Sequence, residues 1–259
     1  MNEFALRTSA SSLGLWQKCP RMWAYFRLAQ IPGSKQKSWA MVGGMAMDEA
    51  LNRHLLGEFK GTALKDFYVT RLRELIVQEA PQGEPDNLLE IDGTRLLEIY
   101  ERDVTPNLTV LEIQKKMERD FEGRPFQAHI DLIRLGGLGN KVIADHKFTK
   151  HTPPPDLAAK SLQLRAYDWL LDDPEHQVEL ISLIRLRRSP RVLVSPHRVS
   201  QDDRREFLRD VREANQGIDA GKYPAVPTVP WICRPGLCGA WSICKGRKEG
   251  PLPIEGERK

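Results

Sequence analysis

The four cysteines of this 259-residue chain are divided between its two ends: Cys19 lies early, and Cys233, Cys238 and Cys244 cluster late. The first residues lack the pattern of a secretion signal, so we expect a cytoplasmic protein rather than a disulfide scaffold. Four thiolates suit zinc or an iron–sulfur cluster, and gaps of four and five residues are wider than zinc knuckles favour. We therefore favour a cluster, with zinc and unliganded thiols as alternatives. Either metal would join the two ends and close a loop of more than two hundred residues.

Charge is segregated along the chain, although the formal net charge is only +4. Residues 4–47 contain six basic side chains and no acid, and residues 185–198 contain five arginines and no acid. A polyanion-binding surface needs such segregation, because phosphate contacts gain from counterion release. The pattern indicates nucleic-acid binding, with a locally compensated solvated surface as the alternative. No apolar run approaches the roughly 18–20 residues that cross a bilayer, so we expect no membrane partner.

Hydrophobic periodicity is helical over the first hundred residues and changes to a period of two near residue 108. We expect helices over 9–29 (broken at Pro20), 41–56, 64–79, 88–100, 156–171 and 200–220, the last with a Ser200–Asp203 capping box. Strands are expected over 108–118, 125–135, 141–148, 178–186 and 191–199. This order predicts an α/β fold with a mixed sheet flanked by helices. We treat 1–259 as a single domain with a helical part (1–106), a core (107–222) and a cysteine region (223–246).

The predicted hairpin of the second and third strands carries the residues with the clearest chemistry. If its turn is centred on Leu138, Asp131 lies opposite Asp145, with Cβ atoms about 4.5–5.5 Å apart on one face. Two carboxylates this close repel each other unless a cation such as Mg²⁺ or Mn²⁺ lies between them. Lys147 shares the face by strand alternation, and its ammonium can polarise water or stabilise a pentavalent phosphorane. The trio predicts phosphodiester hydrolysis; a solvent-facing strand with a cross-strand salt bridge is the alternative.

Gln163 and Tyr167 are four residues apart on the next predicted helix and therefore share a face. An amide and a phenol beside an acidic site can hold a phosphate or a base. An ordinary pair on a helix surface is the alternative interpretation.

The order Asp131, Asp145-His146-Lys147 and Gln163-x-x-x-Tyr167 resembles the PD-(D/E)XK nuclease superfamily in its RecB-like branch. The opening Ser12-x-x-x-Trp16-x-x-Cys19-Pro20-Arg21-x-Trp23 is similar to the N-terminal motif of the iron–sulfur members of that branch. Those members include the CRISPR-associated RecB-like exonucleases and the AddB nuclease domain. The resemblance spans about residues 8–246.

The resemblance implies a restriction-endonuclease-like core and a Mg²⁺- or Mn²⁺-dependent DNA exonuclease acting on single strands or DNA ends. It implies that Asp131, Asp145 and the backbone carbonyl of His146 bind the metal and that Lys147 is the catalytic lysine. Gln163 and Tyr167 would lie near the DNA strand. The four cysteines would hold a structural [4Fe–4S] cluster, and the partners would be proteins of DNA repair, recombination or CRISPR adaptation.

One departure from the branch's pattern bears on function. Asp48, in Gly44-Met45-Ala46-Met47-Asp48, occupies the place of the usual histidine ligand, and aspartate is also a good ligand for a hard cation. It motivates an alternative, a non-catalytic DNA-binding or assembly subunit that keeps the fold and the cluster. A zinc-containing, RNA-directed protein is a third hypothesis.

Four other positions are compared with the pattern of the RecB-like branch. Ala128 replaces the glycine usual three residues before the first aspartate, and Glu112 is matched to an upstream acidic position. His54 and His129 are the nearest histidine substitutes, and we expect a core or surface role for each.

Overall fold

The computed structural model describes residues 7–29, 37–81, 83–172, 176–186, 188–225, 233–235 and 237–245. The chain forms two compact units, each built from separate segments. The cysteine unit comprises Met1–Lys35, Glu118–Ala128 and Ser200–Lys259, and the carboxylate unit comprises Gln36–Met117 and His129–Val199. No helix in the described segments is both long and apolar enough to cross a membrane. The expected single domain stays a prediction.

A five-stranded mixed sheet confirms the predicted α/β class. Its strands are β1 (Thr109–Phe121), β2 (Arg124–Leu135), β3 (Lys141–Thr149), β4 (Gln177–Ile184) and β5 (Arg191–His197), in the order β1-β2-β3-β4-β5. β3 pairs antiparallel with β2 and parallel with β4, and β5 pairs antiparallel with β4. β4 is almost wholly buried because helices cover both faces of the sheet, and its sequence is accordingly a nearly continuous apolar run.

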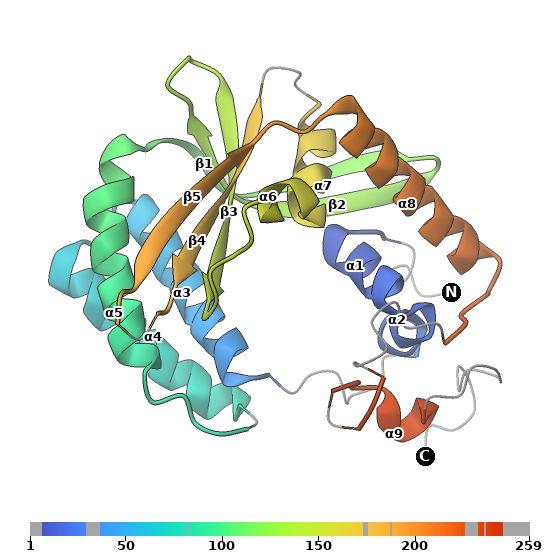
Figure 1. Ribbon diagram of the computed structural model, residues 1–259, viewed down its shortest axis with the longest axis horizontal. Helices are drawn as coiled ribbons and strands as arrows, with labels where there is room; N and C mark the ends of the chain where they lie inside the picture. Colours follow the sequence, from blue (N-terminus) through green and yellow to red (C-terminus); the bar gives the residue numbers. More distant parts are fainter. Residues whose placement is uncertain are drawn as a thin grey trace. The chain divides into compact units, whose positions relative to one another are not determined.

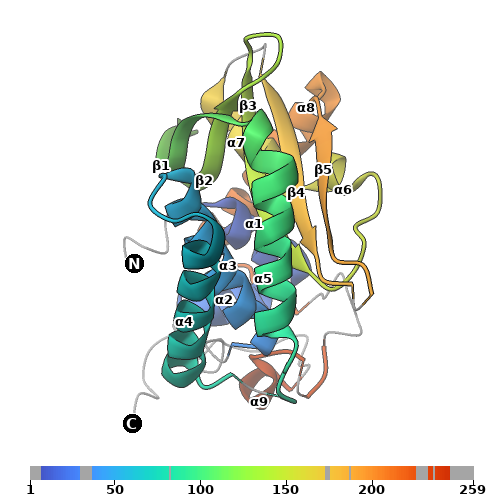
Figure 2. The same cartoon turned by 90° about the vertical axis from the view of Figure 1, so that its left-hand side faces the viewer.

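Helices cover the two faces of the sheet in the carboxylate unit (Figures 1 and 2). One face carries α3 (Trp39–Leu55), α4 (Gly61–Glu79) and α5 (Leu89–Ile99); the other carries α6 (Leu157–Lys160) and α7 (Leu162–Leu171). The single helix expected over 156–171 is wrong. Ser161 adopts an extended backbone and its side chain accepts a hydrogen bond from Leu164 N, so it begins a new helix.

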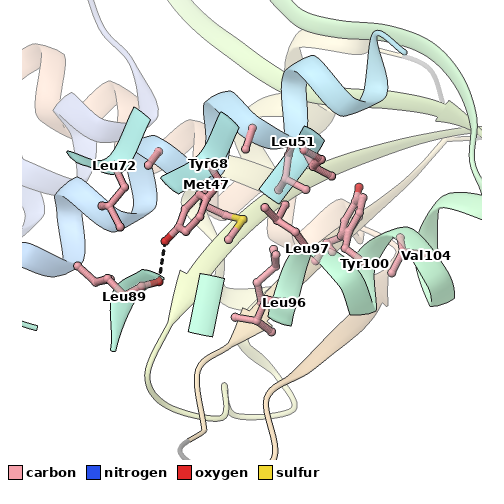
Figure 3. Packing of buried hydrophobic residues seen from close by; sticks show 14 of the residues in the cluster. Met47, Leu51, Tyr68, Leu72, Leu89, Leu96, Leu97, Tyr100 and Val104 are labelled. Carbon is pink, nitrogen blue, oxygen red and sulfur yellow. Dashed lines mark hydrogen bonds between the residues drawn. The ribbon is translucent and has the colours of Figure 1, made fainter. Parts of the chain in front are cut away.

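The main apolar core lies between α3, α4, α5 and the sheet, and Figure 3 shows part of it. Met47 and Leu51 of α3 meet Tyr68 of α4 and Leu97 of α5 in this cluster. The Tyr68 hydroxyl donates a hydrogen bond to the backbone carbonyl of Leu89 at 2.9 Å. A Cβ at Gly93 would overlap the Tyr68 ring, so this close approach of α4 and α5 requires glycine. After Ile99 the helix widens into η3 (Tyr100–Val104), a π-helix, and then η4 (Thr105–Asn107), a 3₁₀ turn.

Arg185 departs from the expected basic surface of residues 185–198. It is only 6% exposed, and its guanidinium donates to Asp86 at 3.0 and 3.1 Å and to Asp92 at 3.2 Å. The same guanidinium lies 5.1 Å from the centre of the Phe148 ring. Arg185 therefore supports the core, because a buried arginine is retained only when carboxylates neutralise it.

The ion pairs between Arg185 and its two aspartates make the stability of the folded protein depend on pH. Burial opposes ionisation of Asp86, but hydrogen bonds from Arg185 and Lys150 outweigh it and lower the pKa of Asp86 to about 2, from 3.8. Between pH 4 and pH 2 the unfolded chain therefore binds more protons at this carboxyl than the folded protein does. The free energy of unfolding consequently decreases as the pH is lowered through this range. We expect Asp86→Asn to lower the free energy of unfolding near pH 6 by about 1–3 kcal/mol.

The difference between wild type and Asp86→Asn should shrink as the pH falls from about 4 to about 2, measured by urea unfolding at each pH. Asp66→Asn, at an exposed aspartate of α4, is the matched control. A difference that stays constant over this range would contradict the assignment.

The cysteine unit contains α1 (Ala10–Lys18), α2 (Pro20–Arg27), α8 (Gln201–Asp219) and the short α9 (Trp241–Cys244). The predicted break at Pro20 is confirmed, because α2 begins at that proline and Cys19 stands between the two helices with an extended backbone. The predicted capping box is also confirmed: Ser200 and Asp203 exchange both hydrogen bonds. Arg21 is buried and donates to the Tyr223 carbonyl, so this residue of the basic N-terminal stretch is structural.

Candidate active site

The β2–β3 hairpin has the register that a turn centred on Leu138 predicts. Leu135 pairs with Lys141, and the pairing continues to Leu132 and Ala144, one residue short of the two aspartates. There Asp131 Oδ2 accepts a hydrogen bond from the backbone N–H of His146 at 2.9 Å. The carboxylate thus takes the place of a strand partner and lies beside the Asp145–Lys147 segment.

Lys147 connects the strand to helix α7. Its Nζ lies 2.7 Å from Asp145 Oδ2 and donates to Gln163 Oε1 at 2.6 Å. Gln163 Nε2 approaches the Tyr167 hydroxyl at 3.4 Å, and that hydroxyl donates to the His129 carbonyl at 2.8 Å and lies 3.4 Å from Asp145 Oδ1. The structure therefore brings the strand residues and the helix pair into one hydrogen-bonded group.

The two aspartates of this group, Asp145 buried and Asp131 half-buried, influence each other's ionisation. Burial, followed by the charge of Asp145, raises the pKa of Asp131 to about 7 despite the His146 N–H. Burial also raises the pKa of Asp145, which is 1% exposed, although Lys147 acts in the opposite direction. Two such carboxyls retain a proton readily, and a hard cation could take that proton's place.

His146 connects β3 to the π-helix η3. Its Nε2 lies 3.0 Å from the Tyr100 hydroxyl, and burial lowers the pKa of His146 to about 4, so the ring is neutral near pH 7. Tyr100 is the first residue of the π-helix, a type of helix that often occurs at functional sites. No sequence motif pointed to Tyr100.

Asp48 approaches the group from α3. Its carboxylate accepts hydrogen bonds from Asn52 at 3.3 Å and from Gln114 of β1 at 3.4 Å, and burial raises the pKa of Asp48. Gln114 adopts a φ of +49°, which is rare for a residue other than glycine. Val110 and Ile113 both pack on the core, so the two-residue alternation breaks between them. The spacing of three between Val110 and Ile113 was the available sequence signal for a distorted strand. The distortion allows the Gln114 side chain to reach Asp48 of α3.

Three other residues weighed from the sequence lie outside this group. Glu112 is exposed and forms an ion pair with Lys115 at 2.7 Å. His54 is buried, and its ring nitrogens meet the Phe59 carbonyl at 3.0 Å and Thr105 Oγ1 at 2.8 Å. His129 is exposed and contributes its backbone carbonyl to Tyr167.

The acidic group lines a cavity of about 400 Å³ in the carboxylate unit. The polar wall consists of Asp48, Asp131, Asp145, His146, Lys147 and Gln163. The apolar wall includes Met41, Gly44 and Met45 of α3 and Phe148 of β3. The cavity therefore presents charged and apolar surfaces to the same occupant.

The donor atoms at this cavity suit a hard cation. No set of three or more His, Cys, Asp or Glu side chains within the described ranges is arranged as a complete metal site. Two carboxylates, Asp131 and Asp145, and the backbone carbonyl of His146 would nevertheless supply the oxygen ligands that Mg²⁺ and Mn²⁺ prefer. The raised pKa values of both aspartates fit a site that binds a cation in exchange for protons.

The four cysteines lie near one another in the cysteine unit. Cys244 is buried in an apolar cluster against which Cys19 and Cys238 also pack, so the early and late cysteines meet as predicted. Burial raises the pKa of Cys233, and the charges of Cys244 and Cys19 raise it further. Burial likewise raises the pKa of Cys238, with smaller contributions from the other three thiols. Within the described residues the cysteines are not arranged as a complete metal site, so a metal centre on these four sulfur atoms stays a prediction.

Comparisons with known proteins give one family match and several structural similarities at low sequence identity. The sequence profile described as the PD-(D/E)XK nuclease superfamily matches residues 7–245. A candidate exonuclease from Eubacterium rectale has a similar crystal structure, with a TM-score of 0.60 and 13% identity over 97% of this chain and 91% of that one. A phage-related exonuclease from Haemophilus somnus 129PT gives a TM-score of 0.33 and 15% identity over 60% of this chain and 84% of its own. A search of curated proteins returns no match.

Proposed function

The chain belongs to the PD-(D/E)XK nuclease superfamily, and from this we propose that it is a divalent-metal-dependent deoxyribonuclease, an exonuclease acting on single-stranded DNA or DNA ends. The observation that carries the proposal is the meeting of Asp131, Asp145 and Lys147 at one cavity. Two carboxylates and an ammonium at one cavity are groups that metal-assisted phosphodiester hydrolysis uses.

Each residue of the group has a role in this proposal. Asp131, Asp145 and the His146 carbonyl would hold Mg²⁺ or Mn²⁺, which when bound lowers the pKa of the attacking water and withdraws charge from the phosphate. Lys147 stabilises the negative charge that develops on the phosphate, because its ammonium stays directed by Gln163 and Asp145. Tyr167 anchors α7 to the two strands through the His129 carbonyl and the nearby Asp145 carboxylate.

The size of the cavity supports a single strand or a frayed end as substrate. A volume of about 400 Å³ is at the lower end of small-ligand sites, so it suits one nucleotide rather than a paired duplex. We further propose that the protein acts in the cytoplasm, in DNA repair, recombination or CRISPR adaptation. It would carry a [4Fe–4S] cluster on Cys19, Cys233, Cys238 and Cys244. The cluster would hold the cysteine unit together and take no part in cleavage.

Asp48 favours a second candidate, a non-catalytic DNA-binding or assembly subunit. Its carboxylate accepts hydrogen bonds from the side-chain amides of Asn52 and Gln114. Coordination of the metal by Asp48 would therefore require both hydrogen bonds to break. Retention of Asp131, Asp145 and Lys147 together favours the active enzyme, because a decayed site would be expected to lose one of them.

The deciding experiment is a cleavage assay with purified protein, Mn²⁺ or Mg²⁺, and single- and double-stranded DNA labelled at either end. We expect stepwise shortening of single strands or ends with metal and none with EDTA. Tight, salt-sensitive DNA binding without cleavage would instead favour the subunit. Preference for labelled RNA, with stoichiometric zinc in a colourless protein, would favour the RNA-directed alternative.

A further inference from the structure

Helix α3 contains two consecutive glycines, and the structure accounts for only one of them by packing. A Cβ at Gly43 would lie 2.5 Å from Leu89 Cδ2 and 3.0 Å from Phe148 Cε1, so the close approach to α5 and β3 favours glycine unless these side chains shift. A Cβ at Gly44 would meet no described atom within 4 Å. Glycine is a poor helix former, so an unpacked glycine inside a 17-residue helix calls for another explanation.

The open space beside Gly44 is the candidate active-site cavity. Met41, Gly44, Met45 and Asp48 occupy positions i, i+3, i+4 and i+7 of the helix, so they form one stripe along α3. The stripe begins with apolar side chains, of which Met41 is 54% exposed, and ends at the Asp48 carboxylate. Phe148 lines the same cavity from β3, with the Arg185 guanidinium over its ring.

We propose that Met41, Gly44, Met45 and Phe148 form a subsite for the base of the nucleotide whose phosphate lies at Asp131, Asp145 and Lys147. This inference rests on the proposed nuclease function. A nucleotide carries a charged phosphate and an apolar base face a few ångströms apart, and the cavity offers a charged wall and an apolar wall in the same way. Gly44 leaves a flat surface on which a planar ring can approach the helix backbone.

The chemistry of this wall determines what it recognises. Methionine is flexible and polarisable, and an aromatic ring stacks on any base, so the contacts depend on the base face rather than its edge. The described apolar residues that line the cavity carry no hydrogen-bonding side chain, so they cannot read the edge. The subsite therefore accepts all four bases and discriminates against a position that lacks a base.

The proposal can be tested without cleavage, by measuring DNA binding in the presence of EDTA. Fluorescence anisotropy of short, labelled single-stranded oligonucleotides gives the affinity. One oligonucleotide set is intact, and in a second set one position at a time is abasic. We expect the wild type to bind one particular abasic oligonucleotide about 10-fold more weakly than the intact one. Met45→Ala should weaken binding of intact DNA by a similar factor and leave binding of the abasic oligonucleotide nearly unchanged.

Gly44→Leu separates binding from folding. A Cβ at this position meets no described atom within 4 Å, the cavity gives room for the rest of the side chain, and leucine is a better helix former than glycine, so the melting temperature should stay constant or rise by about 2–4 °C. Intact DNA should bind at least about 10-fold more weakly, because the leucine occupies the place of the base. Val77→Ala, at an 84% exposed apolar residue of α4, should bind like wild type and serves as the control.

Equal wild-type affinity for intact and every abasic oligonucleotide would overturn the subsite, as would wild-type DNA binding by both Gly44→Leu and Met45→Ala. Failure of the proposed function gives a different result. The wild type would then cleave no DNA with Mn²⁺ in the parallel assay, whatever its response to abasic sites.

Discussion

Replacing Asp145 with asparagine is expected to lower the rate of Mn²⁺-dependent DNA cleavage by about 10³-fold or more. Loss of several kcal/mol of charge stabilisation by the metal corresponds to this factor, because each 1.36 kcal/mol changes a rate tenfold. The buried carboxylate that would bind the cation and that holds Lys147 within 2.7 Å is then a neutral amide. Initial rates on end-labelled DNA give the comparison.

The same substitution should leave the protein folded. The charge of Asp145 contributes to the raised pKa of Asp131, so Asp145→Asn removes a repulsion from the folded state at neutral pH. Urea unfolding without metal should therefore show equal or greater stability. Glu112→Gln, at an exposed acid paired with Lys115, should cleave like wild type. Cleavage by Asp145→Asn at the wild-type rate would refute the assigned site.

Replacing Cys238 with serine is expected to remove the metal centre and with it the folded cysteine unit. Structural metal sites contribute apparent binding free energies of about 10–16 kcal/mol, which match or exceed the net stability of a typical domain. Cys238 packs against the apolar cluster that contains Cys244, and Cys19 packs against the same cluster. We expect an insoluble or protease-sensitive protein without broad violet–blue absorption, whereas the anaerobically purified wild type should be brown.

Ile243→Ser is the matched control, because it introduces a hydroxyl beside Cys244 at a partly exposed position and spares every thiol. It should retain both iron and colour. A colourless wild type with stoichiometric zinc would reject the iron–sulfur assignment. A metal-free Cys238→Ser protein that folds and cleaves DNA normally would reject the structural role.

Local chemistry made much of this fold predictable. Pro20 separates α1 from α2 because it cannot continue a helix, and Ser200 with Asp203 begins α8 through side-chain hydrogen bonds to nearby backbone groups. The turn around Leu138 determines the register of β2 and β3, and that register brings Asp131 beside the Asp145 segment. Each of these features depends on residues close together in the sequence.

Features that depend on distant residues could not be predicted in this way. Arg185 looked like part of a DNA-binding surface, because its partners Asp86 and Asp92 lie about a hundred residues earlier. The contact of Gln114 with Asp48 requires a distorted strand and a helix sixty-six residues away. The inclusion of Glu118–Ala128 in the cysteine unit likewise left no local signal.

The discontinuous cysteine unit has a consequence for how the protein is made. Cys19 leaves the ribosome more than two hundred residues before Cys233, Cys238 and Cys244 have been translated. At usual elongation rates of about 5–20 residues per second, this thiol waits roughly 10–45 s for the rest of its set. During that interval the carboxylate unit, which ends at Val199, has been completely synthesised. If the four thiols hold the proposed cluster, its assembly would therefore follow synthesis of the carboxylate unit, and a cell short of iron would contain a finished carboxylate unit with an unfinished cysteine unit.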